Sequence, residues 1–458
     1  AAQGDQAQAI EYLQRALDLR QAELSRPDSL LALTQSDLAW QLRASGKHGE
    51  AAALFEQALT VQQQLLGDEH PDAASTLFGL AVSHHELGQF EEAEAVFERA
   101  LARFDTATMR PHPLAAEALL NIAMIRRLRS QIYDAEPLAA SAVAMREALY
   151  DPGHPDVIEA LGEWGVSLRD VGRYEESERL LREALDRANR SLGYDHRLTL
   201  TMRERWGTVL YHLGRYEEAA ATVDSSIAVK RERLEPTDAN YIMALSRAGD
   251  PYWMDNRLDR AEERYRAALE GAGLSGIYSI LVLDGLANIA SARGDRDQAD
   301  RLFDESLALA SEKLRPGHRY TQTVRVDRAH LRIAQGRGAE MVDTLLNVLE
   351  IRGQVFREPH PAIGRALQPL GAAYLAAGDA AQAERVLLRA LESYAEIPDT
   401  HWRVGEVESL LGEALVAQDR RVDGMRLLRE GHATVVAHVG PDSWQARATA
   451  ARLAAAGG

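Results

Sequence analysis

The sequence predicts an all-α fold, a solenoid of antiparallel helix pairs. The first observation is a recurring six-residue segment, which reads GQFEEA at Gly88–Ala93, GRYEES at Gly172–Ser177 and GRYEEA at Gly214–Ala219. The second is that small and apolar residues recur at fixed distances from the first residue of this segment, here called the anchor. Because self-similarity at one period identifies a repeat array, the 458 residues are read as one array.

Eleven anchors cover the chain, most of them 42 residues apart, with a step of 38 between Asn256 and Gly294 and one of 41 before Asp419. They are Gly4, Gly46, Gly88, Ser130, Gly172, Gly214, Asn256, Gly294, Gly336, Gly378 and Asp419. Seven residues before the anchor every residue is Ala or Gly, and nine residues after it every residue is apolar. These offsets fit one face of a helix on each side of the anchor, so each unit is predicted to hold a helix A before the anchor and a helix B after it.

The anchor and the loop before helix A carry their own signals. A glycine can end helix A in the left-handed conformation, and the two glutamates that follow suit the first turn of helix B. The loop contains a histidine, usually followed by proline, at His70, His112, His154, His196, His318 and His360. Because no second ligand recurs beside these histidines, we interpret them as capping and loop-packing residues rather than metal ligands.

Composition excludes several classes of function. The net charge of −17 argues against nucleic-acid binding, and the absence of cysteine excludes a disulfide scaffold and a thiolate metal site. There is no apolar run long enough for a membrane span and no secretion leader, so we expect a cytoplasmic chain without a membrane partner. No phosphate loop, complete zinc-protease motif or nucleophile elbow is present, so we expect no enzyme activity, no cofactor and no metal.

This pattern resembles the tetratricopeptide repeat (TPR), and its 42-residue period and His-Pro loop resemble the kinesin-light-chain-like subclass. The segment Tyr133–Leu138 looks like that subclass's opening of helix B, including Pro137. The resemblance implies a right-handed superhelical solenoid that binds peptides on a concave face lined by helix A. It also implies that chains of this kind in bacteria often follow a catalytic domain of a signalling protein. The subclass has an asparagine nine residues before the anchor that touches bound peptide, and only Asn121 matches it.

The array is predicted to divide into regular units at 1–270 and divergent units at 271–458. The chain begins in a helix B, so we expect Ala1 to be a cut point inside a larger protein, and we expect a capping helix at Trp444–Ala456 before a natural C-terminus. The shortened step, Pro251 and three glycines predict an irregular stretch at 249–276, with Pro251 kinking or shortening its helix, as Pro369 does in a later unit.

The groove is predicted from the helix-A positions 13, 10, 6 and 3 residues before the anchor, which form one stripe. The expected peptide-binding residues are Trp40, Arg43, Phe78, Val82, His85, Asn121, Met124, Arg127, Val166, Arg169, Tyr211 and Trp253. The cations Arg43, His85, Arg127 and Arg169 indicate an acidic, partly apolar segment, unless each arginine pairs with a local carboxylate. We therefore expect a non-enzymatic scaffold that binds an extended peptide; the alternative is the regulatory or sensor region of a larger signalling enzyme.

Overall fold

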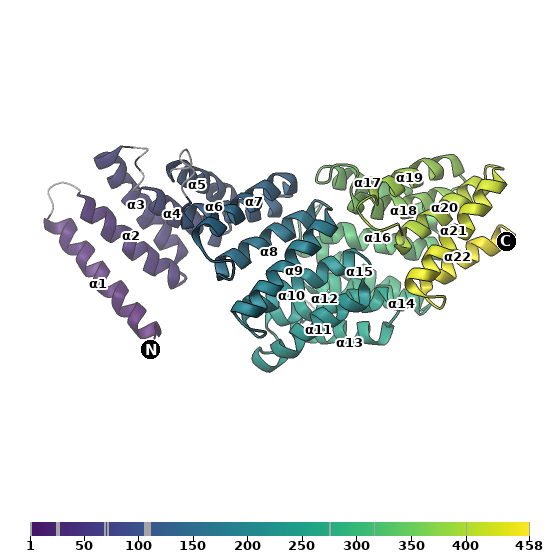
Figure 1. The fold of residues 1–458 in the computed structure, drawn as a ribbon, viewed down its shortest axis with the longest axis horizontal. Coiled ribbons are helices and arrows are strands. Elements are labelled where there is room, and N and C mark those ends of the chain that lie inside the picture. The colour runs from purple at the N-terminus through teal and green to yellow at the C-terminus, as the bar shows by residue number, and fades with distance from the viewer. Residues whose placement is uncertain are drawn as a thin grey trace. The chain divides into compact units, whose positions relative to one another are not determined.

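A computed structural model describes residues 2–23, 28–67, 70, 73–104, 111–273, 276–315, 317–399 and 401–457. In these residues the secondary structure consists of 22 α-helices and one short 3-10 helix, with no strand (Figure 1). Odd-numbered helices are the B helices and even-numbered helices are the A helices. The predicted all-α array with eleven B helices is therefore confirmed.

The chain forms two compact units, residues 1–167 and residues 168–458, here called unit 1 and unit 2. In unit 1 the helices are α1 (Ala2–Glu23), α2 (Ser29–Ala44), α3 (His48–Leu66), α4 (Ala73–Glu86), α5 (Phe90–Arg103), α6 (Pro113–Leu128), α7 (Ile132–Leu149) and most of α8 (Pro155–Asp170). The division at 167/168 lies inside α8. The predicted division at 270/271 is of another kind, because it separates regular from divergent repeats. That division stays a prediction.

Unit 2 contains the remaining fourteen helices and the 3-10 helix. They are α9 (Tyr174–Ser191), α10 (Arg197–His212), α11 (Tyr216–Arg233), α12 (Ala239–Met254), α13 (Leu258–Ala272), α14 (Ser279–Ala292), α15 (Arg296–Lys313), α16 (Arg319–Ala334), η1 (Gly338–Met341), α17 (Val342–Gly353), α18 (Pro361–Ala376), α19 (Ala380–Ser393), α20 (Trp402–Val416), α21 (Arg421–Val439) and α22 (Trp444–Ala455).

The packing of each B helix explains the small residues of helix A. Tyr265, nine residues after its anchor, is 1% exposed, and its ring lies against Gly249 of its own unit and Gly285 of the next unit. A Cβ atom on either glycine would meet the Tyr265 ring closer than real Cβ contacts allow. Phe55 fills the space beside Gly79 in the same way. At Tyr265 and Phe55 a large side chain on helix B thus occupies the space that the neighbouring glycines of helix A leave free.

From Gly46 onward the anchors adopt the predicted left-handed conformation, whereas Gly4 lies within α1. Their φ angles lie between +58° at Asn256 and +92° at Gly172, and three of these residues are not glycine. The loop histidines cap the following helix A: Nδ1 of His112 accepts from the Leu114 amide at 3.2 Å, and Nδ1 of His360 accepts from the Ala362 amide at 3.0 Å. The interpretation as caps is confirmed at His112, His154, His196, His318 and His360.

Pro251 does not shorten its helix, so that part of the sequence prediction is wrong, and whether it kinks the helix stays a prediction. Helix α12 runs for 16 residues with Pro251 in its last turn, and α18 also runs for 16 residues with Pro369 inside it. In α12 the carbonyl of Pro251 accepts from the Asp255 amide at 3.0 Å, so the helix end is capped in the usual way. The four missing residues are absorbed by shorter helices, since α13 has 15 residues and α14 has 14. Whether this stretch is a hinge stays a prediction.

Candidate functional site

The A helices of unit 1 present one row of half-buried side chains. Helix α2 contacts α4, and α4 contacts α6, so equivalent positions of successive units lie on one surface. Six residues before the anchor, Trp40, Val82 and Met124 are half-buried. The three cations of unit 1 that stand three residues before the anchor are also half-buried, at Arg43, His85 and Arg127. The structure therefore brings these six predicted residues to a partly accessible surface.

The position ten residues before the anchor belongs to the core, which corrects the predicted stripe. Phe78 is 2% exposed and stands against Phe97 with ring centroids 5.5 Å apart, and Leu120 is 8% exposed. Val166 is also buried. Because helix A packs against the next helix A through this side, the accessible position is one residue later, where half-buried Asn121 lies. The accessible stripe thus consists of the helix-A positions 13, 9, 6 and 2 residues before the anchor.

Trp40 links the core to this surface. Its ring stands edge-on to Phe55 at 5.3 Å and stacks on Phe78 at 6.3 Å. The guanidinium of Arg43 lies over the Trp40 ring, 5.0 Å from its centroid. Arg43 forms no ion pair within the described residues, and its Nε is buried without a hydrogen-bond partner. Arg43 is therefore the cation of this surface with the most capacity for a ligand.

Two of the other predicted cations are neutralised locally. Arg127 Nη1 lies 3.2 Å from Glu163 Oε2, and Arg169 Nη2 lies 2.6 Å from Asp170 Oδ1. For these two arginines the alternative of local ion pairs is the one observed. His85 instead packs against the Phe90 ring, with centroids 5.6 Å apart. Local ion pairs thus reduce the positive charge expected along four repeats, at Arg127 in unit 1 and at Arg169 in unit 2.

Carboxylates also occupy this surface. Asp37 and Glu117 are exposed, yet burial raises the pKa of each carboxyl above its ordinary value. Nearby Arg146 partly opposes the rise at Glu117. Protein atoms thus surround part of each carboxyl and disfavour its charged form, even though water reaches it. The Asn121 side chain donates to the Glu117 carbonyl oxygen at 2.9 Å, which fixes its orientation.

Tyr211 and Trp253, two of the three predicted groove residues in unit 2, contact other parts of unit 2 itself. Trp253 stacks on Trp444 of α22, with ring centroids 5.8 Å apart and planes 12° from parallel. Tyr211 lines a pocket between the first and the last helices of this unit. Neither residue belongs to an open groove. The cause is a contact between distant repeats, here called the seam.

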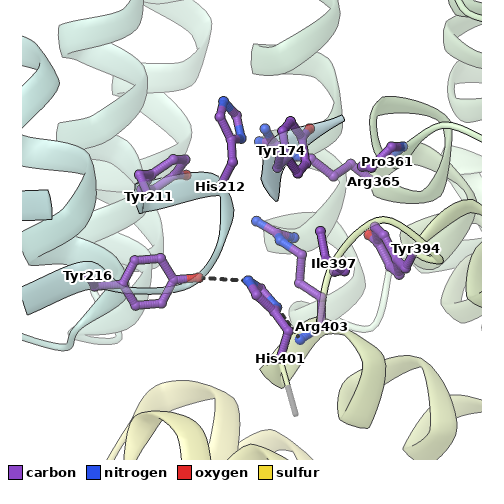
Figure 2. A pocket seen from close by; sticks show the side chains of 10 residues that line it. All are labelled: Tyr174, Tyr211, His212, Tyr216, Pro361, Arg365, Tyr394, Ile397, His401 and Arg403. Atoms are coloured by element: carbon purple, nitrogen blue, oxygen red, sulfur yellow. Dashed lines mark hydrogen bonds between the residues drawn. The ribbon is translucent and has the colours of Figure 1, made fainter. Parts of the chain in front are cut away.

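The seam joins the ends of helices α8, α10 and α12, with the anchor turns that follow them, to segments later in the chain. These segments lie 185 to 191 residues later, or 224 residues later in the case of His438. His360 Nε2 donates to the Asp170 carbonyl at 3.1 Å, and His438 Nε2 donates to the Gly214 carbonyl at 3.2 Å. The Tyr216 hydroxyl accepts from Trp402 Nε1 at 2.6 Å. It also accepts from His401 Nε2 at 3.3 Å, as Figure 2 shows. Unit 2 thus returns on itself after roughly four and a half 42-residue repeats.

Loop histidines hold the seam because of their capping role. Nδ1 of His360 and of His401 accepts an amide hydrogen from the next helix, at 3.0 and 3.1 Å, so the neutral ring carries its hydrogen on Nε2. That Nε2–H then donates across the seam. Burial lowers the pKa of His360 to about 4 and that of His401 well below its ordinary value, which keeps both rings neutral. The repeat pattern identified the cap at His360 but not the cap at His401, and it contained no signal for the partners across the seam.

Acidic side chains of unit 2 are also enclosed by protein. Burial raises the pKa of Asp250 to about 6, although the Tyr265 hydroxyl donates to its carboxylate and opposes the rise. Burial and the neighbouring carboxyl of Asp327 raise the pKa of Asp284 well above its ordinary value, and the two carboxyls are hydrogen-bonded to each other. Burial and a neighbouring carboxyl both disfavour the charged form of Asp284.

Within the described residues, no group of three or more acidic or histidine side chains is arranged to hold a metal ion. Across the same part of the chain, no helix combines the length and the apolar character needed to cross a membrane. Paired helices and left-handed anchors define the class of protein: a helical-repeat protein. The family follows from comparison with known proteins.

Family profiles described as tetratricopeptide repeat match residues 1–64, 30–106, 198–272 and 320–396, and two further profiles of the same description match 115–156, 157–198 and 282–317. The chain therefore belongs to the tetratricopeptide repeat family. None of the curated proteins compared with the chain matches it.

Solved structures similar to this chain include kinesin-light-chain-type proteins. Two of these structures are of a Podosopora anserina putative kinesin light chain with nearly identical TPR-like repeats, and one of the two is a substituted variant. Each is 22% identical to this chain and covers 46% of it. The TM-score is 0.40, or 0.41 for the variant. The matches include 100% and, for the variant, 98% of those chains. BtubC (BKLC) of P. vanneervenii is 18% identical over 58% of this chain and 88% of its own, with a TM-score of 0.30. These values carry no argument about a ligand.

Proposed function

We propose that the chain is a non-enzymatic protein-interaction scaffold that holds an extended segment of a partner on the A helices of unit 1. The TPR fold itself suggests an interaction scaffold. The observation that supports the finer proposal is a set of apolar side chains along the accessible stripe of three successive units. These residues are Leu33, Trp40, Val82, Met124 and Leu128. Leu33 is 55% exposed and Leu128 is 54% exposed, and apolar groups that recur on one face mark an interaction surface.

The repeat geometry favours an extended ligand. Equivalent side chains stand on adjacent A helices, so a ligand that uses several of them has to cross those helices. A segment of this kind binds through its backbone and a few side-chain anchors. Asn121 uses one amide hydrogen within its own helix, at 2.9 Å from the Glu117 carbonyl, and its amide oxygen can accept a backbone N–H.

The charges of the surface limit the acidic character of the ligand. Arg127 is paired with Glu163, so it offers less to a ligand carboxylate than the sequence suggests. Arg43 forms no ion pair in the described part of the chain and lies over Trp40. We therefore propose one acidic residue of the partner near Arg43 and apolar residues toward Met124, rather than an acidic run along all units.

The experiment is a selection of short random peptides on the full chain, followed by fluorescence anisotropy with variants. Leu33→Ser and Leu128→Ser remove exposed apolar groups and leave the core intact, and each is expected to weaken a selected peptide roughly tenfold, which corresponds to about 1.5 kcal/mol of apolar burial. Leu65→Ser on α3 is the matched control, because Leu65 is also exposed, at 46%, but lies on a B helix.

Two results would contradict the proposal. One is a selection that yields no peptide dependent on Leu33 or Leu128. The other is a set of peptides whose affinity falls with Leu65→Ser but not with Leu33→Ser or Leu128→Ser. Circular dichroism spectra that match the wild type show that each variant is folded.

The alternative, a regulatory or sensor region of a larger signalling enzyme, finds support in unit 2. Its inner side chains contact the unit's own distant repeats at the seam, so a ligand there would change how the repeats hold together. Recording the unfolding of the chain with and without candidate effectors tests this alternative, and it predicts a shift that seam variants remove.

A further inference from the structure

The seam of unit 2 contains a pocket that no predicted activity uses. Figure 2 shows its side chains arriving from two sets of helices that are far apart in sequence. The pocket encloses about 350 Å³ of empty space, part of it open to solvent. Its lining consists of Tyr174, Tyr211, His212, Tyr216, Pro361, Arg365, Tyr394, Ile397, His401 and Arg403.

Two guanidinium groups line this pocket and no carboxylate does. Arg365 and Arg403 form no ion pair in the described residues, and Arg365 Nε is buried without a hydrogen-bond partner. Arg403 lies over the Trp402 ring, 4.5 Å from its centroid. The charge of Asp327 raises the pKa of Arg365, but the hydrogen-bond partner of Asp327 is Asp284.

Other arginines of unit 2 show the contrast. On α16, Arg328 Nη2 lies 2.6 Å from Asp304 Oδ1 and Arg332 Nη2 lies 2.8 Å from Asp300 Oδ1. A buried charge without a partner is unfavourable, and a chain with a net charge of −17 has many carboxylates to spare. The pair Arg365 and Arg403 therefore has capacity for an anion that the protein itself does not supply.

The opposite wall adds hydrogen-bond donors. The phenol groups of Tyr174 and Tyr211 have no hydrogen-bond partner within the described chain, and Figure 2 shows both rings at the pocket. Burial raises the pKa of Tyr174 to about 12 and also raises that of Tyr211, so both hydroxyls keep their hydrogens. His212 stacks on Tyr174 with ring planes 7° apart, and burial lowers its pKa to about 3, so its neutral ring can also donate.

We propose that this pocket binds a phosphate group between Arg365 and Arg403, with Tyr174 and Tyr211 donating from the other side. Two cations balance a dianion, and donors on two opposed walls suit a tetrahedral group better than a planar carboxylate. Because the pocket is partly open to solvent, the phosphate group lies at its opening, and the rest of a phosphomonoester extends into solvent. The bound group connects α18 and the start of α20 to α9 and α10, so it holds the seam closed. This site is independent of the peptide surface proposed for unit 1.

The test is isothermal titration calorimetry of the full chain with inorganic phosphate and with phenyl phosphate, at constant ionic strength. Arg365→Gln and Arg403→Gln are each expected to weaken binding about 10- to 100-fold, because each loses charge-assisted hydrogen bonds. Arg332→Gln is the control, since that arginine is paired on α16. Arg365→Lys keeps the positive charge but loses the two parallel hydrogen bonds that a guanidinium group can donate, so it should retain part of the affinity.

Binding of phenyl phosphate but not inorganic phosphate identifies a phosphomonoester as the ligand, and binding of both identifies the phosphate group alone; either result supports the site if the two Gln variants lose it. Absence of binding by both probes overturns the proposal. Binding that both variants retain, or that Arg332→Gln removes, also overturns it. Equal binding of malonate overturns the choice of phosphate. If a Gln variant is misfolded by circular dichroism, Tyr211→Phe provides the same test, with a smaller expected loss of about 3- to 10-fold.

Discussion

Replacing Gly214 by alanine tests whether the seam of unit 2 forms in solution. Gly214 has a φ of +80°, and a Cβ atom there would lie 2.7 Å from two ring atoms of His438 and 2.8 Å from His401 Cδ2. Gly378 occupies the same anchor position with a φ of +79°, and no atom lies within 4 Å of its added Cβ. The two substitutions therefore share the backbone strain and differ in the seam.

The size of the difference follows from these contacts. Left-handed alanine costs about 1–2 kcal/mol at both positions. Only Gly214→Ala also overpacks two rings, which costs about 1–3 kcal/mol, and it disturbs the hydrogen bond from His438 Nε2 to the Gly214 carbonyl. At about 2–4 °C per kcal/mol for a large domain, the extra loss in unfolding midpoint is roughly 2–12 °C.

The assay is thermal unfolding by circular dichroism with hydrogen exchange on the same samples. Gly214→Ala should unfold at a lower temperature than Gly378→Ala and should speed amide exchange around Tyr216 and His438, whereas Gly378→Ala should change exchange only near its own turn. Equal midpoints and equal exchange at Tyr216 and His438 would refute the seam. Faster exchange in both variants would show that the strain spreads along the array, and the contact argument would then be wrong.

Three further outcomes are expected. Gly285→Ala should destabilise unit 2 by about 1–2 kcal/mol because its Cβ meets the Tyr265 ring, whereas exposed Gly353→Ala at the end of α17 should be neutral or stabilising; equal melting of the two would contradict the packing rule. Burial lowers the pKa of His212 from 6.5 in the unfolded chain to about 3 in the folded chain. Below pH 6.5 the unfolded chain therefore binds one more proton than the folded chain. The free energy of unfolding then decreases as the pH is lowered, by at most about 1.4 kcal/mol per pH unit. His212→Phe keeps the ring stack and should flatten the denaturation midpoint measured against pH; an unchanged slope would exclude His212 as its cause. Arg43→Gln should weaken a selected acidic peptide about tenfold in anisotropy and lessen its salt dependence, and unchanged binding would place the acidic contact elsewhere.

Local rules of the array could be predicted from the sequence because they depend on residues close along the chain. The left-handed anchors, including Ser130 and Asn256, follow from the 42-residue register, and the helix caps at His112 and His360 follow from the loop motif. Each of these features is decided within one repeat. Two helices that alternate over such a register have to stack, since one unit cannot bury its own apolar face.

The candidate surface was predicted only in part. Trp40, Val82 and Met124 reach the accessible stripe, whereas Phe78 does not, because helix A also packs on the next helix A and the angle of that packing decides which of two neighbouring positions is buried. The pairing of Arg127 with Glu163 depends on the same angle, since the two residues lie in adjacent units.

The sequence by itself determined the repeat, its turns, its caps and its small-residue positions. Only the tertiary structure decided that Trp253 lies under Trp444, that Tyr216 meets His401, and that Arg365 and Arg403 share a pocket. The physical reason is that small rotations between successive units add up over several repeats. Where the array returns on itself depends on their sum, and no single repeat encodes that sum.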